Sequence, residues 1–247
     1  MSEPMLQVRG LAKQFGSLRA LDGVDLDVAE GSLTGLIGPN GAGKSTAFAC
    51  IAGAEKPAAG SIRFRGREIG GMAYHRVAAL GIGRTYQIVQ TFADMTVLEA
   101  TTTGALLRHH RVRDAIAHAE DVLDFVGLAG KRHRLGRALT IADKKRLEVA
   151  RALATEPSLL LLDEVMAGLT PAECRDAVEL LRRVLARGTT VLMVEHVMEV
   201  LMPIAQHVVV IAAGKTIFSG SAADAVRDRR VVEAYLGSPL EHGEIAS

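Results

Sequence analysis

One glycine-rich stretch of the sequence has the residue types and spacing needed to hold a phosphate. GLIGPNGAGKST, at positions 35–46, follows an apolar run and leads into the helical segment TAFACIAG. The glycines let backbone N–H groups curl round a phosphate, and the helix points its positive end there. We expect Lys44 to reach the β and γ oxygens of a nucleotide and Ser45 to bind Mg²⁺, roles that an ordinary glycine-rich turn does not need. The predicted nucleotide-binding residues here are Gly38, Pro39, Asn40, Gly41, Ala42, Gly43, Lys44, Ser45 and Thr46.

A second stretch, LLLLDE at positions 159–164, places two carboxylates directly after an apolar run. Ligands of an open α/β sheet bind at the carboxyl ends of its strands, so we expect Asp163 to hold Mg²⁺ through water. Glu164 has the position and chemistry of a general base that orients the attacking water. Acidic residues after a strand often do no more than end the strand in solvent. The functional interpretation of this pair depends on the phosphate loop elsewhere in the same chain.

The pattern of apolar residues predicts the strands and helices that must position these side chains. VDLDV at 24–28 alternates, as a half-buried strand does, whereas SLTGLIG and SLLLLD are continuous apolar runs expected of strands covered on both faces. Residues 170–188 predict a helix, with Thr170 as N-cap, Glu173 completing a capping box and Gly188 past its end. A hairpin is expected to turn at 213–214. The sequence therefore predicts a parallel α/β core.

Strand signals vanish between about 90 and 155, where helical periodicity takes over. We interpret residues 89–155 as a helical lobe inserted into one domain that spans 1–247, with the α/β core formed by 1–88 and 156–247. The length suits one domain with a lobe, and we find no internal repeat or long linker.

Composition excludes several classes of protein. The chain has 29 Lys and Arg against 28 Asp and Glu. Its net charge is therefore too small to attract it to nucleic acid or to an anionic membrane. Cys50 and Cys174 lack metal-ligand spacing and are expected to be small buried hydrophobes. No apolar run approaches the roughly 18 residues of a membrane helix, and the start has no signal-peptide pattern. We expect a cytosolic chain that would meet a membrane only through another polypeptide.

Taken in order, the motifs resemble those of the nucleotide-binding subunit of an ABC transporter, over nearly the whole chain. The resemblance implies a P-loop NTPase fold of ABC-ATPase type, with antiparallel β structure near the N-terminus. It also implies three further contacts. Gln87 in RTYQ matches the glutamine that contacts Mg²⁺ and water, His196 in MVEH the switch histidine at the γ-phosphate, and Phe15 in KQFG the aromatic residue that stacks on adenine. A core Phe at a strand end is the alternative for Phe15.

The family's signature motif, LSGGQ or LSYGQ, is altered here to LTIAD at 139–143, although KKRLEVARAL follows in register. In the family this segment contacts the nucleotide held by the opposing subunit. Thr140 keeps a hydroxyl, the Cβ of Ala142 crowds backbone approach, and the charge of Asp143 would repel a phosphate. Impaired contact and tolerated variation both remain open, since Thr140 and Asp143 also form a capping pair. If contact is impaired, the working dimer pairs this chain with a different ATP-binding subunit, and a homodimer is the alternative.

The resemblance implies an ATP-hydrolysing subunit at the inner face of the cell membrane. Its cofactors would be ATP and Mg²⁺, its partners transmembrane permease subunits and a second ATP-binding subunit, with a substrate-binding protein acting indirectly. GIGRTYQIVQTFADMTVLE, DEVMAGLTPAE and VVEAYLG look most like importers of branched-chain amino acids and related amides. The alternatives are a regulatory subunit of low turnover and a soluble ABC protein of repair or translation.

Two further predictions concern the surface of the protein. A groove for a short helix of the membrane subunit is expected around Gln87, lined by Phe92, Met95, Val97 and Leu98. The basic cluster Lys131, Arg132, Arg134 and Arg137 is expected to be a solvated loop rather than a contact for nucleic acid.

Overall fold

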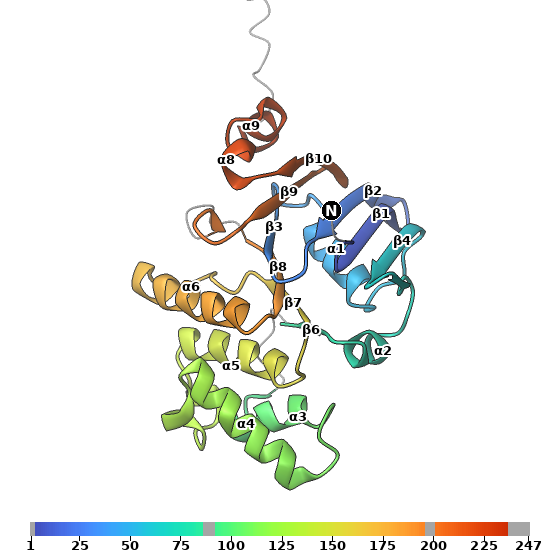
Figure 1. Ribbon diagram of the computed structural model, residues 1–247. Coiled ribbons are helices and arrows are strands. Elements are labelled where there is room, and N and C mark those ends of the chain that lie inside the picture. Colours follow the sequence, from blue (N-terminus) through green and yellow to red (C-terminus); the bar gives the residue numbers. More distant parts are fainter. Residues whose placement is uncertain (1–2, 86–91, 196–200, 237–247) are drawn as a thin grey trace, which may run out of the picture.

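The computed structural model describes residues 3–85, 92–195 and 201–236. Gln87 and His196 lie outside these ranges, so their predicted roles stay predictions. In the part described, a central sheet separates two layers (Figure 1): the antiparallel strands and α1 (Lys44–Ile51) lie on one side, and the long helix α6 (Pro171–Ala186) on the other.

The central sheet has six strands in the order β10-β9-β3-β8-β7-β6. All neighbours pair in parallel except β10 and β9, which form an antiparallel hairpin. Every residue of β3, β7 and β8 is buried, as their continuous apolar runs predict. The bounds are β3 (Leu33–Ile37), β6 (Ile82–Arg84), β7 (Leu159–Asp163), β8 (Thr190–Val194), β9 (His207–Ala212) and β10 (Lys215–Gly220).

A second sheet is antiparallel and has four strands in the order β2-β1-β4-β5. It confirms the expected antiparallel part near the N-terminus, and Val24, Leu26 and Val28 share the buried face of β2. Phe48 of α1 is fully buried in the apolar cluster between the two sheets, which fixes α1 and the loop before it. The bounds are β1 (Leu6–Phe15), β2 (Leu18–Val28), β4 (Ala59–Phe64) and β5 (Arg67–Glu68).

Helices follow one another between residues 92 and 155, as the periodicity predicts, and they occupy the lower part of Figure 1. Thr96 caps α3 in a capping box with Glu99, and α4 ends at Gly127 in the left-handed conformation. The bounds are α3 (Val97–Ala105), α4 (Val112–Val126), the 3₁₀ turns η2 (Ala129–Lys131) and η3 (Gly136–Ala138), and α5 (Ile141–Leu153).

Helix α6 has the predicted capping box between Thr170 and Glu173, with Gly188 past its end at φ 85°. Leu180, Leu181 and Val184 of α6 are buried, whereas Cys174, which was expected to be buried, is only half-buried. The reason is that the first turns of α6 border an open groove with the segment 166–169. The other helices are α2 (Tyr74–Ala79), α8 (Ala222–Ala225) and α9 (Arg229–Leu236).

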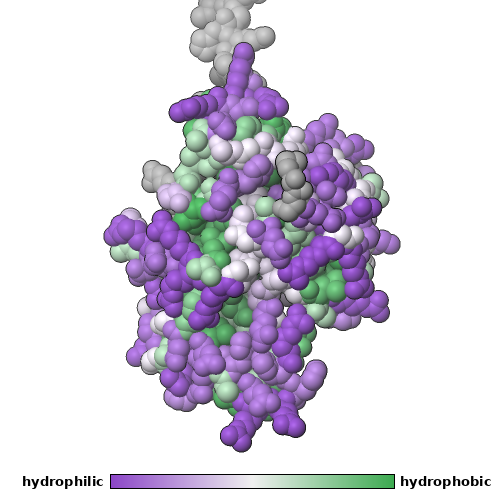
Figure 2. Space-filling model, viewed as in Figure 1, coloured by the Kyte–Doolittle hydropathy of each residue, from purple (hydrophilic) through white to green (hydrophobic). Residues whose placement is uncertain are grey.

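None of the helices within 3–85, 92–195 and 201–236 combines the length and hydropathy needed to cross a lipid bilayer. The face shown in Figure 2 is mostly hydrophilic, with hydrophobic side chains gathered in small patches.

Candidate functional site

The glycine-rich loop runs from the buried end of β3 to the first residue of α1, as its sequence predicts. Gly38 has φ 150°, and a Cβ there would lie 2.0 Å from the carbonyl oxygen of Ile211 on β9. Gly43 has φ 104°, and its Cβ would lie 2.6 Å from the carbonyl oxygen of Ala20. Backbone from two other strands therefore packs against the loop, and only glycine fits at these two positions.

Lys44 folds back over the loop from the first position of α1. Its ammonium group donates to the carbonyl oxygens of Gly38 (2.7 Å) and Pro39 (2.8 Å), and the residue is 5% exposed. Burial lowers the pKa of Lys44, opposed by the nearby carboxylates of Glu164 and Asp163. The ammonium group of Lys44 is therefore placed to bind a phosphate at this loop. A phosphate oxygen would replace the two carbonyl oxygens as its partner.

A cavity of about 570 Å³ opens beside this loop. Its walls are the loop and the first turn of α1, the end of β1 and the start of β2, the Ala213–Gly214 turn of the β9–β10 hairpin, and Glu164. Phe15 is half-exposed on one wall, with the ammonium of Lys13 4.7 Å from its ring centre. The structure therefore brings Phe15, predicted from the family resemblance, to the same cavity as Lys44. The loop residues that line it are Asn40, Gly41, Ala42, Gly43, Lys44, Ser45 and Thr46.

Asp163 ends β7 and is 3% exposed. Burial raises its pKa, while the charge and hydrogen bond of Arg84, 3.1 Å away on the neighbouring strand β6, oppose the rise. Its backbone N–H donates to Thr85 Oγ1, which fixes the end of the strand. The other carboxylate oxygen, Oδ1, is buried without a hydrogen-bond partner among the described residues.

That buried oxygen suits a hydrated Mg²⁺ ion. Magnesium prefers oxygen ligands and usually keeps several waters. The carboxylate of Asp163 and the hydroxyl of Ser45, which is exposed in the cavity wall, are ligands of this kind. The residues present therefore fit Mg²⁺ at this cavity.

Glu164 follows Asp163 with a backbone φ of 50°, which is uncommon for a residue other than glycine. Its N–H donates to Val194 O (3.0 Å) and its carbonyl oxygen accepts from Lys145 Nζ (2.8 Å). These contacts hold the turn from both sides, and Glu164 lines the cavity that Lys44 and Ser45 also line. Strained backbone of this kind concentrates at functional sites.

Thr140 and Ala142, at the start of α5, do not line the Lys44 cavity. Thr140 is the N-cap and accepts from the N–H of Asp143 (3.2 Å), as predicted. The carboxylate of Asp143 instead accepts two bonds from Lys131 Nζ, at 2.7 and 2.6 Å. Burial alone would raise the pKa of Asp143, but the hydrogen bonds from Lys131 and Thr140 and the charge of Lys131 lower it. The charge expected to repel a phosphate is therefore paired.

One residue that was expected to line the groove for a membrane-subunit helix lies in the core instead. Val97 is fully buried, so the prediction is wrong there, because Val97 is the first helical residue of α3 and faces the core. Phe92 packs against that core, with the guanidinium of Arg151 3.6 Å from its ring centre. Arg151 also pairs with Glu148 (2.8 Å) and lines a neighbouring groove of about 240 Å³. Gln87 lies outside the described residues.

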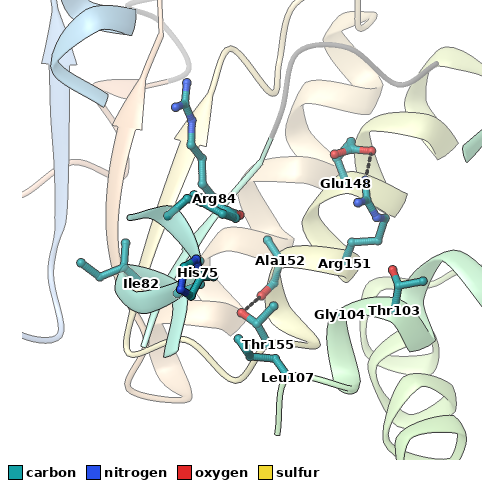
Figure 3. A pocket seen from close by; sticks show the side chains of 13 residues that line it. His75, Ile82, Arg84, Thr103, Gly104, Leu107, Glu148, Arg151, Ala152 and Thr155 are labelled. Atoms are coloured by element: carbon teal, nitrogen blue, oxygen red, sulfur yellow. Dashed lines mark hydrogen bonds and ion pairs between the residues drawn. The ribbon is translucent and has the colours of Figure 1, made fainter. Parts of the chain in front are cut away.

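Figure 3 shows how this groove is built. Its sides come from α2, β6, α3 and α5, so both the α/β core and the helices of 92–155 contribute. Labelled lining residues include His75, Arg84, Thr103, Leu107, Glu148 and Arg151. No sequence pattern indicated this set, because residues from four separate segments meet only in the fold.

Comparison with known proteins identifies the family. The family model for the ABC transporter, ABC_tran, matches residues 21–167, which include the glycine-rich loop, Asp163 and Glu164. The chain belongs to the ABC transporter family. It is an ABC-type ATPase, as the motifs in its sequence predict.

Curated ABC relatives match nearly the whole chain. The chain is 38% identical to the high-affinity branched-chain amino acid transport ATP-binding protein BraF of Pseudomonas aeruginosa, covering 96% of this chain and 99% of the relative. It is 36% identical to the corresponding protein LivG of Escherichia coli, with the same coverage.

Solved ABC structures share the fold. A nucleotide-free ATP-binding cassette of an ABC transporter aligns with TM-score 0.88 and 29% identity, over 95% of this chain and 100% of that chain. An ADP conformation of such a cassette aligns with TM-score 0.87 and 30% identity, over 96% and 100%. The α/β fold of ABC-ATPase type is thereby confirmed.

Proposed function

We propose that the chain is the ATP-hydrolysing subunit of an importer for branched-chain amino acids or related small polar substrates. The observation that carries the proposal is the cavity in which Lys44, Ser45 and Glu164 meet beside the buried carboxylate of Asp163. The substrate class rests on similarity to BraF and LivG over 96% of the chain.

The predicted site residues have proposed roles. The loop from Gly38 to Thr46 surrounds the phosphates with backbone N–H groups, and Phe15 stacks on the adenine. Ser45 and Asp163 would hold Mg²⁺, which would supply positive charge to the phosphates. Gln87 and His196, outside the described residues, are proposed to contact the metal site and the γ-phosphate.

Hydrolysis would be performed by groups already in place. Glu164 accepts a proton from water as the water oxygen bonds to the γ-phosphorus and the bond to the ADP oxygen breaks. Lys44 stabilises the negative charge on the phosphate oxygens. Because Lys44 is buried among carbonyls and carboxylates, its charge acts with little screening by water.

Replacing Glu164 by Gln tests this function. Glu164→Gln keeps the shape of the cavity and removes the base, so MgATP should still bind while phosphate release falls by roughly 10²–10⁴-fold. Size-exclusion chromatography of this variant should show dimerisation that depends on ATP. Hydrolysis at the wild-type rate would rule out Glu164 as the base.

We place the permease contact at the groove between α2, β6, α3 and α5, and we propose a short helix from a membrane subunit as its occupant. The groove joins the proposed core (1–88 and 156–247) to the proposed lobe (89–155), so a helix seated there would sense their relative position. This contact would hold the chain on the cytoplasmic face of the membrane, with any substrate-binding protein acting indirectly.

Charge substitutions test the groove. His75→Glu or Thr103→Glu should abolish co-purification with the permease subunits while the isolated chain keeps its circular dichroism and melting temperature. His133→Glu, at an exposed histidine away from the groove, is the matched control. Assembly that survives both groove substitutions would place the contact elsewhere.

We also propose that the second ATP-binding subunit of the working dimer is a different protein with an intact signature. Thr140 and Ala142 would face the nucleotide of that partner, and the Cβ of Ala142 is an obstacle that pairing of Asp143 with Lys131 does not remove. In a heterodimer only the partner's site carries this defect.

Restoring the signature tests the asymmetry. Ala142→Gly with Asp143→Gln in the assembled transporter should raise turnover at the partner's site, whereas Lys44→Ala should remove most of the native activity. Asp143→Gln alone is the control, since it changes the Lys131 pair without clearing the backbone. A homodimer that turns over fully at both sites would overturn the heterodimer.

A further inference from the structure

Two histidines and a glutamate meet at the amino end of β7, away from the strand end that carries Asp163 and Glu164. His109 follows α3, His118 lies on α4 and Glu156 precedes β7. Their potential ligand atoms all lie within 4.8 Å of one another. The proposed ATPase function uses none of them.

The side chains converge on one point. His109 Nε2 lies 2.8 Å and His118 Nε2 3.7 Å from the same oxygen, Glu156 Oε1, and the two imidazole rings are 4.7 Å apart at their centres. His118 Nε2 is shielded from solvent and has no hydrogen-bond partner in the described part of the chain. A shielded ring nitrogen that lacks a partner is costly unless something else binds it.

The backbone around the cluster is fixed by its own bonds. Arg108, beside His109, donates from Nε to Thr155 O (3.1 Å) and from its terminal nitrogen to Ala79 O (2.9 Å). Glu156 sits at φ 51°, with its N–H donating to Leu153 O (2.9 Å). The guanidinium of Arg108 thus bonds to the carbonyl oxygens of Thr155 and of Ala79, the last residue of α2. The segments that carry His109 and Glu156 are therefore tied to each other independently of the cluster.

The chemistry of the three ligands is that of a transition-metal site. Imidazole nitrogen with carboxylate oxygen suits Zn²⁺, which binds nitrogen at about 2.0–2.1 Å and, in sites with an open position, takes three protein ligands and a water. Ligand atoms already within 4.8 Å need only small side-chain rotations to surround one ion. We propose that His109, His118 and Glu156 bind a zinc ion that ties α3 and α4 to the segment before β7.

Such an ion would act as a clamp. It joins the α3–α4 corner to the chain entering the central sheet, and Thr155, next to Glu156, also lines the groove of Figure 3. Binding to the folded state alone stabilises that state in proportion to the logarithm of the zinc concentration over Kd.

Metal titration of the full chain tests the proposal. Protein stripped with EDTA is titrated with ZnCl₂ by calorimetry, and with CoCl₂ by visible absorption, without nucleotide. We expect one equivalent bound and a melting temperature that rises with zinc. Because losing even a supporting partner of a metal ligand costs 10–100-fold, His118→Ala or Glu156→Gln should weaken binding by roughly 100-fold or more.

His110→Ala is the matched control, since His110 is exposed and adjacent to His109 but outside the cluster. It should bind zinc like wild type. Melting in EDTA checks that each variant folds, and ATP binding should be the same in all of them. The zinc site is refuted if wild type binds no more zinc than the double variant His109→Ala/His118→Ala. It is also refuted if His110→Ala loses as much zinc affinity as His118→Ala.

Discussion

The ion pair between Lys131 and Asp143 gives a quantitative prediction for Lys131→Met. The side chain of Asp143, at the start of α5, is 9% exposed, whereas the side chain of Lys131 is 37% exposed. Lys131→Met keeps most of the aliphatic stem and removes the ammonium. The substitution therefore removes a charged partner from the buried carboxylate of Asp143, in the helix that begins with the altered signature.

The size of the effect follows from these exposures. Removing one partner of a fully buried ion pair costs about 3–5 kcal/mol, and an exposed pair is worth about 0–1 kcal/mol. With one member buried and the other more than a third exposed, we expect about 2 kcal/mol. For a chain of this size that lowers Tm by about 4–8 °C. Asp143→Asn should cost less, because the released Lys131 can reach water.

The pH dependence has a definite sign. The pKa of Asp143 is lowered in the folded state, so the pair's contribution to stability is present above the unfolded pKa and is lost as pH falls through the folded pKa. Without Lys131, burial acts unopposed by that charge and the pKa of Asp143 rises. The stability difference between wild type and Lys131→Met should therefore be largest near neutral pH and shrink in acid.

Urea unfolding at several pH values measures the difference. Arg182→Met is the control, since Arg182 forms an ion pair with Glu179 in which both side chains are more than half exposed. It should change stability little. Equal effects of Lys131→Met and Arg182→Met, or a difference that grows as pH falls, would refute the reasoning.

Packing and burial predict the effects of changes at Gly104 and Cys50, and ring stacking predicts the effect of a change at Phe15. Gly104→Ala should destabilise the fold by about 1–3 kcal/mol in urea unfolding, because its Cβ would lie 2.4 Å from the carbonyl oxygen of Arg151, while Gly130→Ala meets no atom within 4 Å and should be nearly neutral. Burial raises the pKa of Cys50 to about 11, so a thiol reagent at about pH 8 should leave this cysteine unmodified until the protein is unfolded. Phe15→Ala should weaken ATP binding by about 10-fold or more in calorimetry if adenine stacks on the ring, with phosphate-loop contacts intact, and unchanged affinity would remove Phe15 from the site.

The local motifs could be predicted from the sequence because the residues of each motif are adjacent in the chain. The loop from Gly38 to Thr46 needs only its own glycines, a preceding strand and a following helix, all adjacent in the chain. The capping box of Thr170 and Glu173 likewise spans one turn of helix. The fully buried strands β3 and β7 were marked by continuous apolar runs, so the type of sheet was predictable as well.

Contacts between distant segments were decided only by the tertiary structure. Arg84 reaches Asp163 because β6 and β7 are neighbours in the sheet, and no local pattern encodes that adjacency. Lys131 pairs with the carboxylate of Asp143 by approaching from a separate 3₁₀ turn.

Hydropathy also could not say which way each apolar side chain faces. Val97 was expected in a groove and is buried in the core, since an apolar residue at a helix start is compatible with either side. The groove of Figure 3 and the cluster of His109, His118 and Glu156 join segments far apart in sequence. The sequence thus determined the residues that can do phosphate chemistry and the strands that hold them, while long-range packing decided which charges are paired and which surfaces stay open.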